Sequence, residues 1–172
     1  FTGRGVSYCA ICDGAFFREQ VVAVVGGGNV ALNDALFLTR FATKVIVIHR
    51  RDQLRATKIL QDRAFANPRI EFLWDTVVES ITGDKLVREI RLRNVKTGKG
   101  SSLEVSGIFV AVGLRPNTGY LKGLLKLDGG GFIPVNNQME TEVPGIFAAG
   151  DIRVGSIRQV VSAAGDGATA AI

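Results

Sequence analysis

Short β-branched runs alternate with amphipathic stretches in the first part of the chain. Short β-branched runs predict buried parallel strands at Val21–Val25 and Lys44–Ile48, and a third strand is expected at Ile70–Leu73. Apolar residues recur at helical spacing over about 30–41 and 54–66, so a helix is expected in each interval. Asn29 is expected to cap the first helix, and the second should end before Asn67-Pro68. Strands and helices alternating with short connections predict a βαβαβ unit, a parallel sheet covered by helices.

The pattern changes at residue 76. From 76 to 105 apolar and polar residues alternate with period two, which predicts an antiparallel β-meander, and an apolar strand is expected at 107–112. The glycine and proline in 113–117 mark the expected domain boundary. Beyond it we expect strands at 132–135 and 146–149 and a helix at about 156–172, too few elements for a separate core. The predicted fold class is α/β, a Rossmann-like three-layer parallel sheet with an antiparallel meander.

Composition narrows the class of protein. The chain has 172 residues, of which 47% are apolar and 22% charged, and this excludes a disordered chain, a coiled coil and a collagen-like repeat. No apolar run approaches the roughly 18 residues of a membrane span, and the N-terminus lacks a signal-peptide pattern. We therefore expect a cytoplasmic protein with no membrane partner. Because the chain starts at Phe1 and its only methionine is Met139, we also expect it to be part of a longer protein.

The net charge of +5 does not favour a nucleic-acid partner, because basic residues alternate with acids through most of the chain. The densest basic group is His49-Arg50-Arg51 with Arg55 and Lys58. A cluster this compact suits one bound phosphate better than a duplex.

A glycine motif, Gly26-x-Gly28-x-x-Ala31, lies between a predicted strand and a predicted helix. This is the context of a dinucleotide-binding fingerprint. Gly26 would allow a sharp turn, Gly28 would let a pyrophosphate approach the backbone, and Ala31 would let the helix pack close to the sheet. The alternative is a glycine-rich turn that binds nothing.

The residues after the second strand indicate which dinucleotide binds. An NAD site usually has an acid about 20 residues beyond the glycines, whereas this chain has His49-Arg50-Arg51. Guanidinium groups match phosphate oxygens, so the charge favours NADPH over NADH. Arg55 follows Arg51 by four positions, which would place both on one face of the next helix. The alternative is a solvated basic helix start, and the lone His49 could simply be a packing residue.

Cys9 and Cys12 form a C-x-x-C motif followed by Asp13. Two cysteines and one remote histidine cannot supply the four ligands of a structural zinc site, so no metal is expected. The motif favours a dithiol/disulfide pair whose thiolate attacks a partner disulfide, with Asp13 placed to transfer a proton. Two structural cysteines remain the alternative.

Four separated motifs occur in the order typical of one enzyme family. They are C-x-x-C-D-G at 9–14, G-G-G-N-x-A at 26–31, H-R-R-D-x-x-R at 49–55, and P-G-I-F-A-A-G-D at 144–151, with Arg158-Gln159 beyond. The chain thus resembles the low-molecular-weight, bacterial and plant type thioredoxin reductases, and it covers about the C-terminal half of a member.

The resemblance implies a nucleotide domain inserted into an FAD domain. Residues 1–113 would bind NADPH and carry the redox pair, and 114–172 would be the C-terminal part of the FAD domain, whose N-terminal half is absent here. NADPH would pass hydride through FAD to the Cys9–Cys12 disulfide and on to thioredoxin. Cys12 would face the flavin, Cys9 would attack the substrate, and Asp13 would act as acid/base. The parent would be a homodimer.

The resemblance also implies roles for the cofactor-binding residues. Gly150 and Asp151 would close around the ribityl and phosphate groups of the flavin, and Arg158 and Gln159 would lie by its ring. An ordinary turn after a strand is the alternative at Gly150-Asp151. The full expected set is Gly26, Gly28, Asn29, Ala31, His49, Arg50, Arg51, Arg55, Gly113, Gly150, Asp151, Arg158 and Gln159.

Two other functions stay open. One is the flavoprotein subunit of an alkyl hydroperoxide reductase-like system, which shares the C-x-x-C and Gly-Asp motifs but typically lacks the arginine set. The other is a nucleotide-binding module without catalysis, and for this fragment alone we expect NADPH binding without full activity.

Overall fold

The computed structural model describes all residues from 1 to 172, and the chain divides into two compact units. The first unit is Phe1–Val112 and the second is Gly113–Ile172. The first unit contains β1 (Val6–Ser7), α1 (Ala10–Asp13), the 3-10 helix η1 (Gly14–Phe17), β2 (Val21–Val25), α2 (Asn29–Leu38), β3 (Lys44–Ile48), α3 (Lys58–Phe65), β4 (Ile70–Leu73), β5 (Thr76–Gly83), β6 (Val87–Asn94), β7 (Gly100–Glu104) and β8 (Gly107–Val110). The second contains the 3-10 helices η2 (Gly119–Leu121) and η3 (Gly150–Ile152) and the helix α4 (Val160–Ala171). None of the helices is long and apolar enough to span a membrane.

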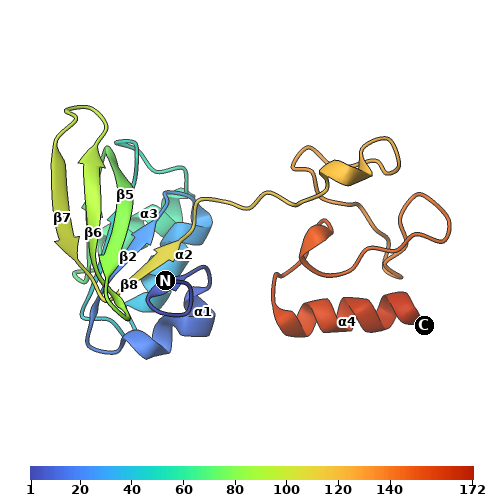
Figure 1. Cartoon of the computed structure of the whole chain (residues 1–172), viewed down its shortest axis with the longest axis horizontal. Coiled ribbons are helices and arrows are strands. Elements are labelled where there is room, and N and C mark those ends of the chain that lie inside the picture. Colours follow the sequence, from blue (N-terminus) through green and yellow to red (C-terminus); the bar gives the residue numbers. More distant parts are fainter. The chain divides into compact units, whose positions relative to one another are not determined.

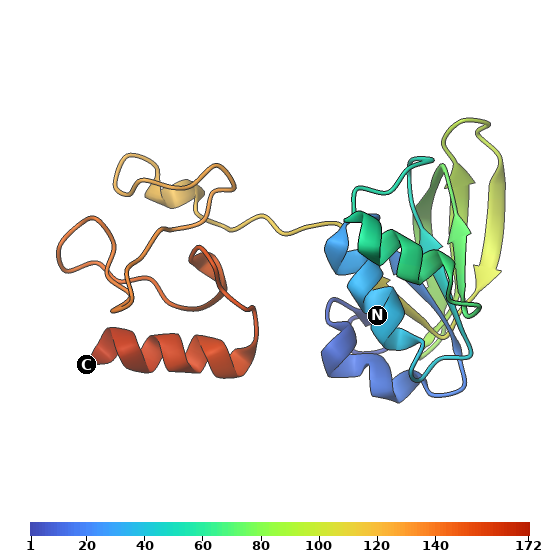
Figure 2. The same cartoon turned by 180° about the vertical axis from the view of Figure 1, so that it is seen from behind.

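The first unit has three layers. Its central sheet is parallel throughout, with the strand order β1-β8-β2-β3-β4. α2 and α3 cover one face of this sheet, and the antiparallel sheet β5-β6-β7 lies over the other (Figures 1 and 2). The predicted fold class, an α/β protein with a parallel sheet and an antiparallel meander, is confirmed.

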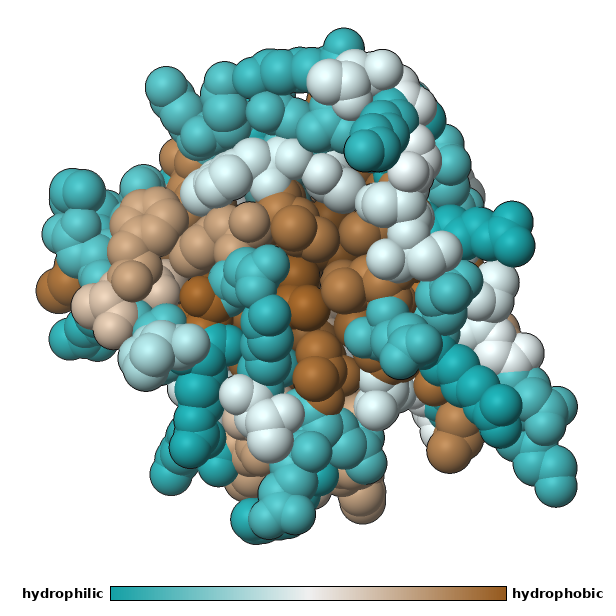
Figure 3. All heavy atoms as spheres, turned by 90° about the vertical axis from the view of Figure 1, so that its left-hand side faces the viewer, coloured by the Kyte–Doolittle hydropathy of each residue, from teal (hydrophilic) through white to brown (hydrophobic).

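Alternate residues of the central strands pack in two separate hydrophobic cores, because successive side chains in a strand point to opposite faces of the sheet. Val22 and Val24 of β2 pack among the helices, whereas Ala23 packs toward the antiparallel sheet. Val87, Ile90 and Leu92 of the meander complete the second core. On the side shown in Figure 3, apolar side chains are visible in the middle of the face and polar ones surround them.

The three predicted parallel strands have the predicted bounds, but the predicted helices are too long: α2 ends at Leu38 and not at 41. Asn29 is not a cap: Gly28 is the N-cap of α2, and the Asn29 side chain instead accepts a hydrogen bond from the Thr57 N–H at 2.8 Å. The second helix begins at Lys58 and not at 54, because the preceding backbone is bound elsewhere: the Arg55 and Ala56 N–H groups both donate to the Gly27 carbonyl. Arg51 and Arg55 therefore do not share a helix face.

Other predicted elements were wrong in extent or type. The apolar strand ends at Val110 rather than 112, and the last helix begins at Val160 rather than 156. The strands predicted at 132–135 and 146–149 are only single bridges, in which Ile133 pairs with Arg153 and Phe147 with Glu140. β1 and α1 were not predicted from the sequence. The second unit has a small apolar cluster centred on Leu125, Ile133 and Ala148.

Candidate functional site

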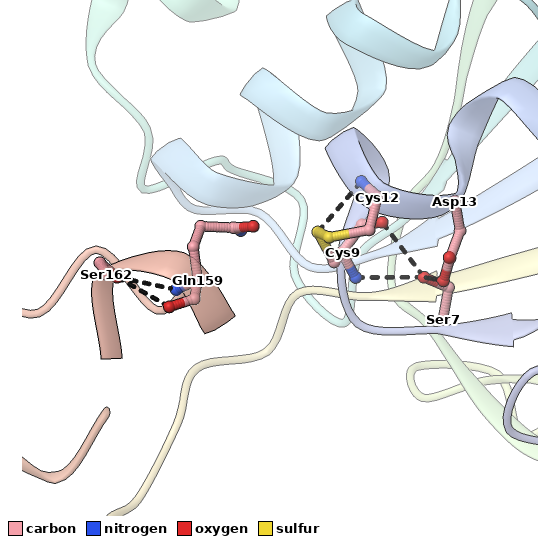
Figure 4. The surroundings of a disulfide bond; sticks show 6 residues. All are labelled: Ser7, Cys9, Cys12, Asp13, Gln159 and Ser162. Atoms are coloured by element: carbon pink, nitrogen blue, oxygen red, sulfur yellow. Dashed lines mark hydrogen bonds between the residues drawn. A yellow bond between two sulfur atoms is a disulfide. The ribbon is translucent and has the colours of Figure 1, made fainter. Parts of the chain in front are cut away.

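Both cysteines lie at the single-turn helix α1, Cys9 at its N-cap and Cys12 within it. Cys9 is the extended N-cap of α1, and the single helical turn brings Cys12 back to a Cα–Cα distance of 5.3 Å. The two residues form a disulfide bond (Figure 4). Cys12 is exposed and Cys9 is half-buried. The expectation of a bonded redox pair in a tight turn is confirmed in geometry, and two unconnected structural cysteines are excluded.

A serine links the disulfide turn to the neighbouring acid. Ser7, buried in β1, donates its hydroxyl hydrogen bond to Asp13 Oδ2 at 2.6 Å, and its Oγ accepts one from the Cys9 N–H at 3.1 Å (Figure 4). Asp13 is thus held beside the cysteine turn rather than merely adjacent in sequence. No sequence signal identified Ser7, because a two-residue strand has no periodicity to read.

The turn also differentiates the two sulfurs. The Cys12 N–H donates to Cys9 Sγ at 3.1 Å. A donor aimed at a sulfur stabilises negative charge on it, so reduction of the bond would favour the thiolate at Cys9. The expected role of Cys9 as the nucleophile stays a prediction.

Gly26 and Gly28 differ in what surrounds them. Gly26 has φ +148°, and a Cβ on it would lie 2.4 Å from the Ala111 carbonyl oxygen and 2.9 Å from the Cβ of Ala31. At Gly28 a Cβ would meet nothing within 4 Å, so no packing inside the chain requires a glycine there. Open space beside the N-cap of a ten-residue helix is what a pyrophosphate needs to approach the backbone.

His49 lies directly against the glycine loop. A Cβ on Gly27 would come within 2.6 Å of the His49 ring, which is 6% exposed and whose Nε2 lies 3.1 Å from the Gln53 carbonyl oxygen. Burial lowers the pKa of His49, and the nearby arginines lower it further, whereas the hydrogen bond to Gln53 opposes them. The imidazole is therefore neutral at pH 7. It shapes the loop, and the charge of the site comes from the arginines.

The three arginines lie in the exposed loop between β3 and α3. None of Arg50, Arg51 and Arg55 forms an ion pair within the chain. The loop is fixed to the glycine turn by the Arg55 N–H, which donates to the Gly27 carbonyl at 2.7 Å. Unpaired guanidinium groups beside a glycine loop fit a phosphate-bearing nucleotide.

Two adjoining cavities connect these features. The first, about 310 Å³, has Gly26, Gly27, His49, Arg50 and Arg55 in its lining. The second, about 350 Å³, is lined by Arg50, Arg51, Asp52, Gln53, Leu54, Arg55, Asp75, Val95 and Lys96. The predicted glycines and arginines are thus brought together in one region of the first unit. Asp75 and Lys96 also line the second cavity, and no sequence pattern indicates them, because both are distant in sequence from the arginine motif.

The remaining candidates lie in the second unit. Gly150, with φ +78°, begins η3, and its N–H donates to Asp166 Oδ2 at 3.0 Å, while Asp151 beside it is exposed. Arg153 makes a bidentate pair with Asp166, with contacts of 2.6 and 2.7 Å, which ties this turn to α4. The turn is therefore a rigid feature with a free carboxylate at its surface.

The other second-unit candidates surround the start of α4. Gln159 is the N-cap of this helix in a capping box with Ser162 (Figure 4), and the Arg158 guanidinium lies 5.2 Å from the centre of the Phe132 ring. Gly113 opens the unit at φ +102°.

Known proteins match the chain over nearly its whole length. A thioredoxin reductase of Streptomyces coelicolor is 49% identical over 172 residues, which are 99% of this chain and 53% of that protein. One of Peptoclostridium litorale is 48% identical, with 99% and 56% covered. The crystal structure of thioredoxin reductase from Streptococcus pyogenes matches with a TM-score of 0.90 and 54% identity, covering 97% of this chain and 55% of that one.

The chain spans about half the length of the curated relatives it matches. The family model described as pyridine nucleotide-disulphide oxidoreductase matches residues 1–167. The chain therefore belongs to the pyridine nucleotide-disulphide oxidoreductase family.

Proposed function

We propose that this chain is the NADPH-binding and disulfide-bearing part of a thioredoxin reductase. The observation that carries the proposal is the presence, in one compact unit, of the partly exposed Cys9–Cys12 disulfide and of a glycine loop with three unpaired arginines. The relatives in the comparison are named thioredoxin reductases, which supports a thioredoxin-like protein as substrate.

The residues of the nucleotide loop fit NADPH. The space at Gly28 would take the pyrophosphate, and Arg50, Arg51 and Arg55 would hold the 2′-phosphate. Asn29 holds the loop after the arginines through the Thr57 N–H, and Ala31 lets α2 pack at the turn. NADPH supplies the hydride when it is bound. The protein residues orient it by charge and by close backbone approach.

The second unit is proposed to contribute to a flavin site in the longer parent. Its candidates are Asp151, on the turn held by Asp166, and Arg158 and Gln159 at the start of α4. When FAD is bound, it supplies two-electron transfer between the nucleotide and the disulfide. A flavin spectrum of the purified chain tests the division of the site: we expect no stoichiometric FAD, and a full flavin complement would contradict it.

The cysteine turn performs the thiol chemistry. Two electrons and two protons convert the Cys9–Cys12 disulfide to two thiols, and Asp13, held by Ser7, is placed to deliver or remove a proton. The Cys9 thiolate then attacks one sulfur of the substrate disulfide, and the other substrate sulfur leaves as a thiolate. Attack by Cys12 on the mixed disulfide releases the reduced substrate and restores the Cys9–Cys12 bond.

The surface near the turn suits a protein substrate. Tyr8, Ile11 and Phe16 are each more than 60% exposed around the cysteines. A hollow of about 540 Å³ next to them includes Ser7, Asp13 and Phe16 in its lining. Exposed apolar side chains beside a reactive group are typical of a surface that binds another protein.

The cytoplasmic location and the homodimeric state of the longer protein remain predictions from the sequence.

Titration of the purified chain with NADPH and NADH tests the nucleotide assignment. We expect tighter binding of NADPH, and the combined Arg50→Ala and Arg51→Ala variant should reduce this preference about 10- to 100-fold, because charge-assisted bonds to phosphate are lost. An unchanged affinity ratio would show that the phosphate assignment is wrong.

For the disulfide, mild oxidation of the reduced chain should remove two thiols together, and two thiols that stay reactive would argue against a redox pair.

A further inference from the structure

The arginine loop contains an acid that opposes the binding of an anion. Asp52 directly follows Arg51, is exposed, and lines the same 350 Å³ cavity as the three arginines. A carboxylate in this position repels a phosphate and competes with it for the guanidinium groups. The cavity therefore needs a way to neutralise Asp52 if it is to bind a phosphate well.

Lys96 provides the neutralising charge from a distant part of the chain. It lies in the turn between β6 and β7, and its Nζ is 2.7 Å from Asp52 Oδ2 and 3.0 Å from Asp75 Oδ2. One ammonium group thus binds both carboxylates of the cavity. The hydrogen bond with Lys96 also holds the pKa of Asp52 below its ordinary value, so this carboxylate stays charged and bound to Lys96 at neutral pH.

Asp75 connects the two loops through its backbone. The Asp75 N–H donates to the Arg51 carbonyl at 3.3 Å, and the Asp75 carbonyl accepts from the Val95 N–H at 2.6 Å. The Asp75 side chain is 16% exposed, which makes it the fixed end of the arrangement. Lys96 therefore contacts a loop whose position relative to the hairpin is already set.

We propose that Lys96 is a specificity-determining residue for NADPH: it neutralises Asp52 and draws that carboxylate toward the β6–β7 hairpin, which leaves the arginines available to the 2′-phosphate. The inference rests on the proposed function, because it assumes that this cavity takes the 2′-phosphate. Lys96 acts through Asp52, so it is a positioning residue and not a direct ligand of the nucleotide.

The exposure of the pair separates this role from a merely structural one. The side chains of Lys96 and Asp52 are 58% and 63% exposed, and ion pairs exposed to this degree contribute little to stability. Loss of Lys96 should therefore leave the thermal unfolding of the first unit almost unchanged. It should change the affinity for the doubly charged phosphate, since a freed carboxylate then faces the binding cavity.

The test is a set of nucleotide titrations on the intact chain. Dissociation constants for NADPH and NADH are measured for the unsubstituted 172-residue chain and for the Lys96→Ala, Asp52→Asn and double variants. Lys96→Ala should weaken NADPH about five- to tenfold at low salt and leave NADH within about twofold. Asp52→Asn in the Lys96→Ala background should restore most of the lost affinity, because the repelling charge is then gone. Lys99→Ala, in the same turn but outside the cavity lining, is the matched control and should match the parent.

Each outcome decides the proposal. Recovery by Asp52→Asn supports it. A loss that Asp52→Asn does not repair would show that Lys96 does not act through Asp52, and an unchanged NADPH/NADH ratio in Lys96→Ala would show that it has no role in specificity. Either result overturns the inference while the proposed function stands. If the unsubstituted chain showed no preference for NADPH over NADH, both this inference and the proposed function would be overturned.

Discussion

Asp34 is a half-buried carboxyl group on α2 whose ionisation should cost stability. It lies on the helix face that also carries Ala31, Ala35 and Leu38, all of which are fully buried in the core between the helices and the parallel sheet. This burial raises the pKa of Asp34 to about 6. We therefore predict that Asp34→Asn stabilises the first unit at pH 7.5.

The sign and size of the effect follow from proton linkage. The ordinary pKa of an aspartate is about 3.9, so the folded state binds more protons than the unfolded state between about pH 4 and pH 6. Stability falls as the pH rises through this window, and the cost is fully present above pH 6. A shift of about two units corresponds to roughly 3 kcal/mol, and because the side chain is only half-buried, solvent screening reduces this to about 1–1.5 kcal/mol.

Urea unfolding followed by the fluorescence of Trp74, the only tryptophan, measures this stability. Asp34→Asn should be more stable than the parent by about 1–1.5 kcal/mol at pH 7.5, and the gain should nearly vanish at pH 4. Asp84→Asn, in the exposed β5–β6 turn, is the control and should stay within about 0.5 kcal/mol of the parent at either pH. A gain from Asp34→Asn that is equal at both values, or a loss at pH 7.5, would refute the reasoning.

Four further predictions concern the glycine loop, the second unit and the salt concentration. Gly28→Ala should leave stability almost unchanged but weaken NADPH binding at least tenfold in titration, because its Cβ would enter only the space proposed for the pyrophosphate; equal affinity would contradict that. Gly27→Ala should cost about 1–3 kcal/mol in urea unfolding, because its Cβ would overlap the His49 ring, and an unaffected midpoint would argue against this packing. Arg153 lowers the pKa of Asp166, so the ion pair stabilises the second unit above about pH 4 and this stability is lost as the pH falls through the lowered pKa. The amide resonance of Gly150, whose N–H donates to Asp166, should shift at this step in the unsubstituted chain and not in Asp166→Asn. Raising the salt concentration from 50 to 500 mM should reduce the NADPH preference over NADH, whereas a constant ratio would exclude a phosphate site built from exposed charges.

The parallel sheet could be predicted from sequence because its signal is local. A buried strand such as Val21–Val25 needs apolar side chains on both faces, and this requirement leaves a continuous run of β-branched residues. β1 left no such trace: it has two residues and is held by backbone pairing with β8. The residues at 132–135 have strand composition, but only Ile133 among them forms a β-bridge, with Arg153.

The candidate site was predictable where its residues form a motif and hidden where folding assembles it. Cys9 and Cys12 form one short motif and the three arginines form another, so the chemistry of each motif could be inferred directly from the sequence. Ser7 reaches Asp13, and Lys96 reaches Asp52, only through the positions of β1 and of the β6–β7 turn. The predicted helix face for Arg51 and Arg55 failed for the same reason, since their loop is set by the Gly27 carbonyl rather than by helix propensity.

Trapping of a mixed disulfide tests most directly whether this chain is the disulfide-reducing part of a thioredoxin reductase. The reduced Cys12→Ser variant keeps Cys9 but lacks the second cysteine that would resolve a mixed disulfide. A single-cysteine thioredoxin, activated as its mixed disulfide with thionitrobenzoate, also lacks the thiol that could reverse the attack, so Cys9 should displace thionitrobenzoate and form a covalent complex that a thiol reductant releases. The reduced Cys9→Ser variant should form much less of this complex. Equal trapping by both variants would contradict the assignment of Cys9 as the nucleophile, and no complex with either variant would contradict the proposed function.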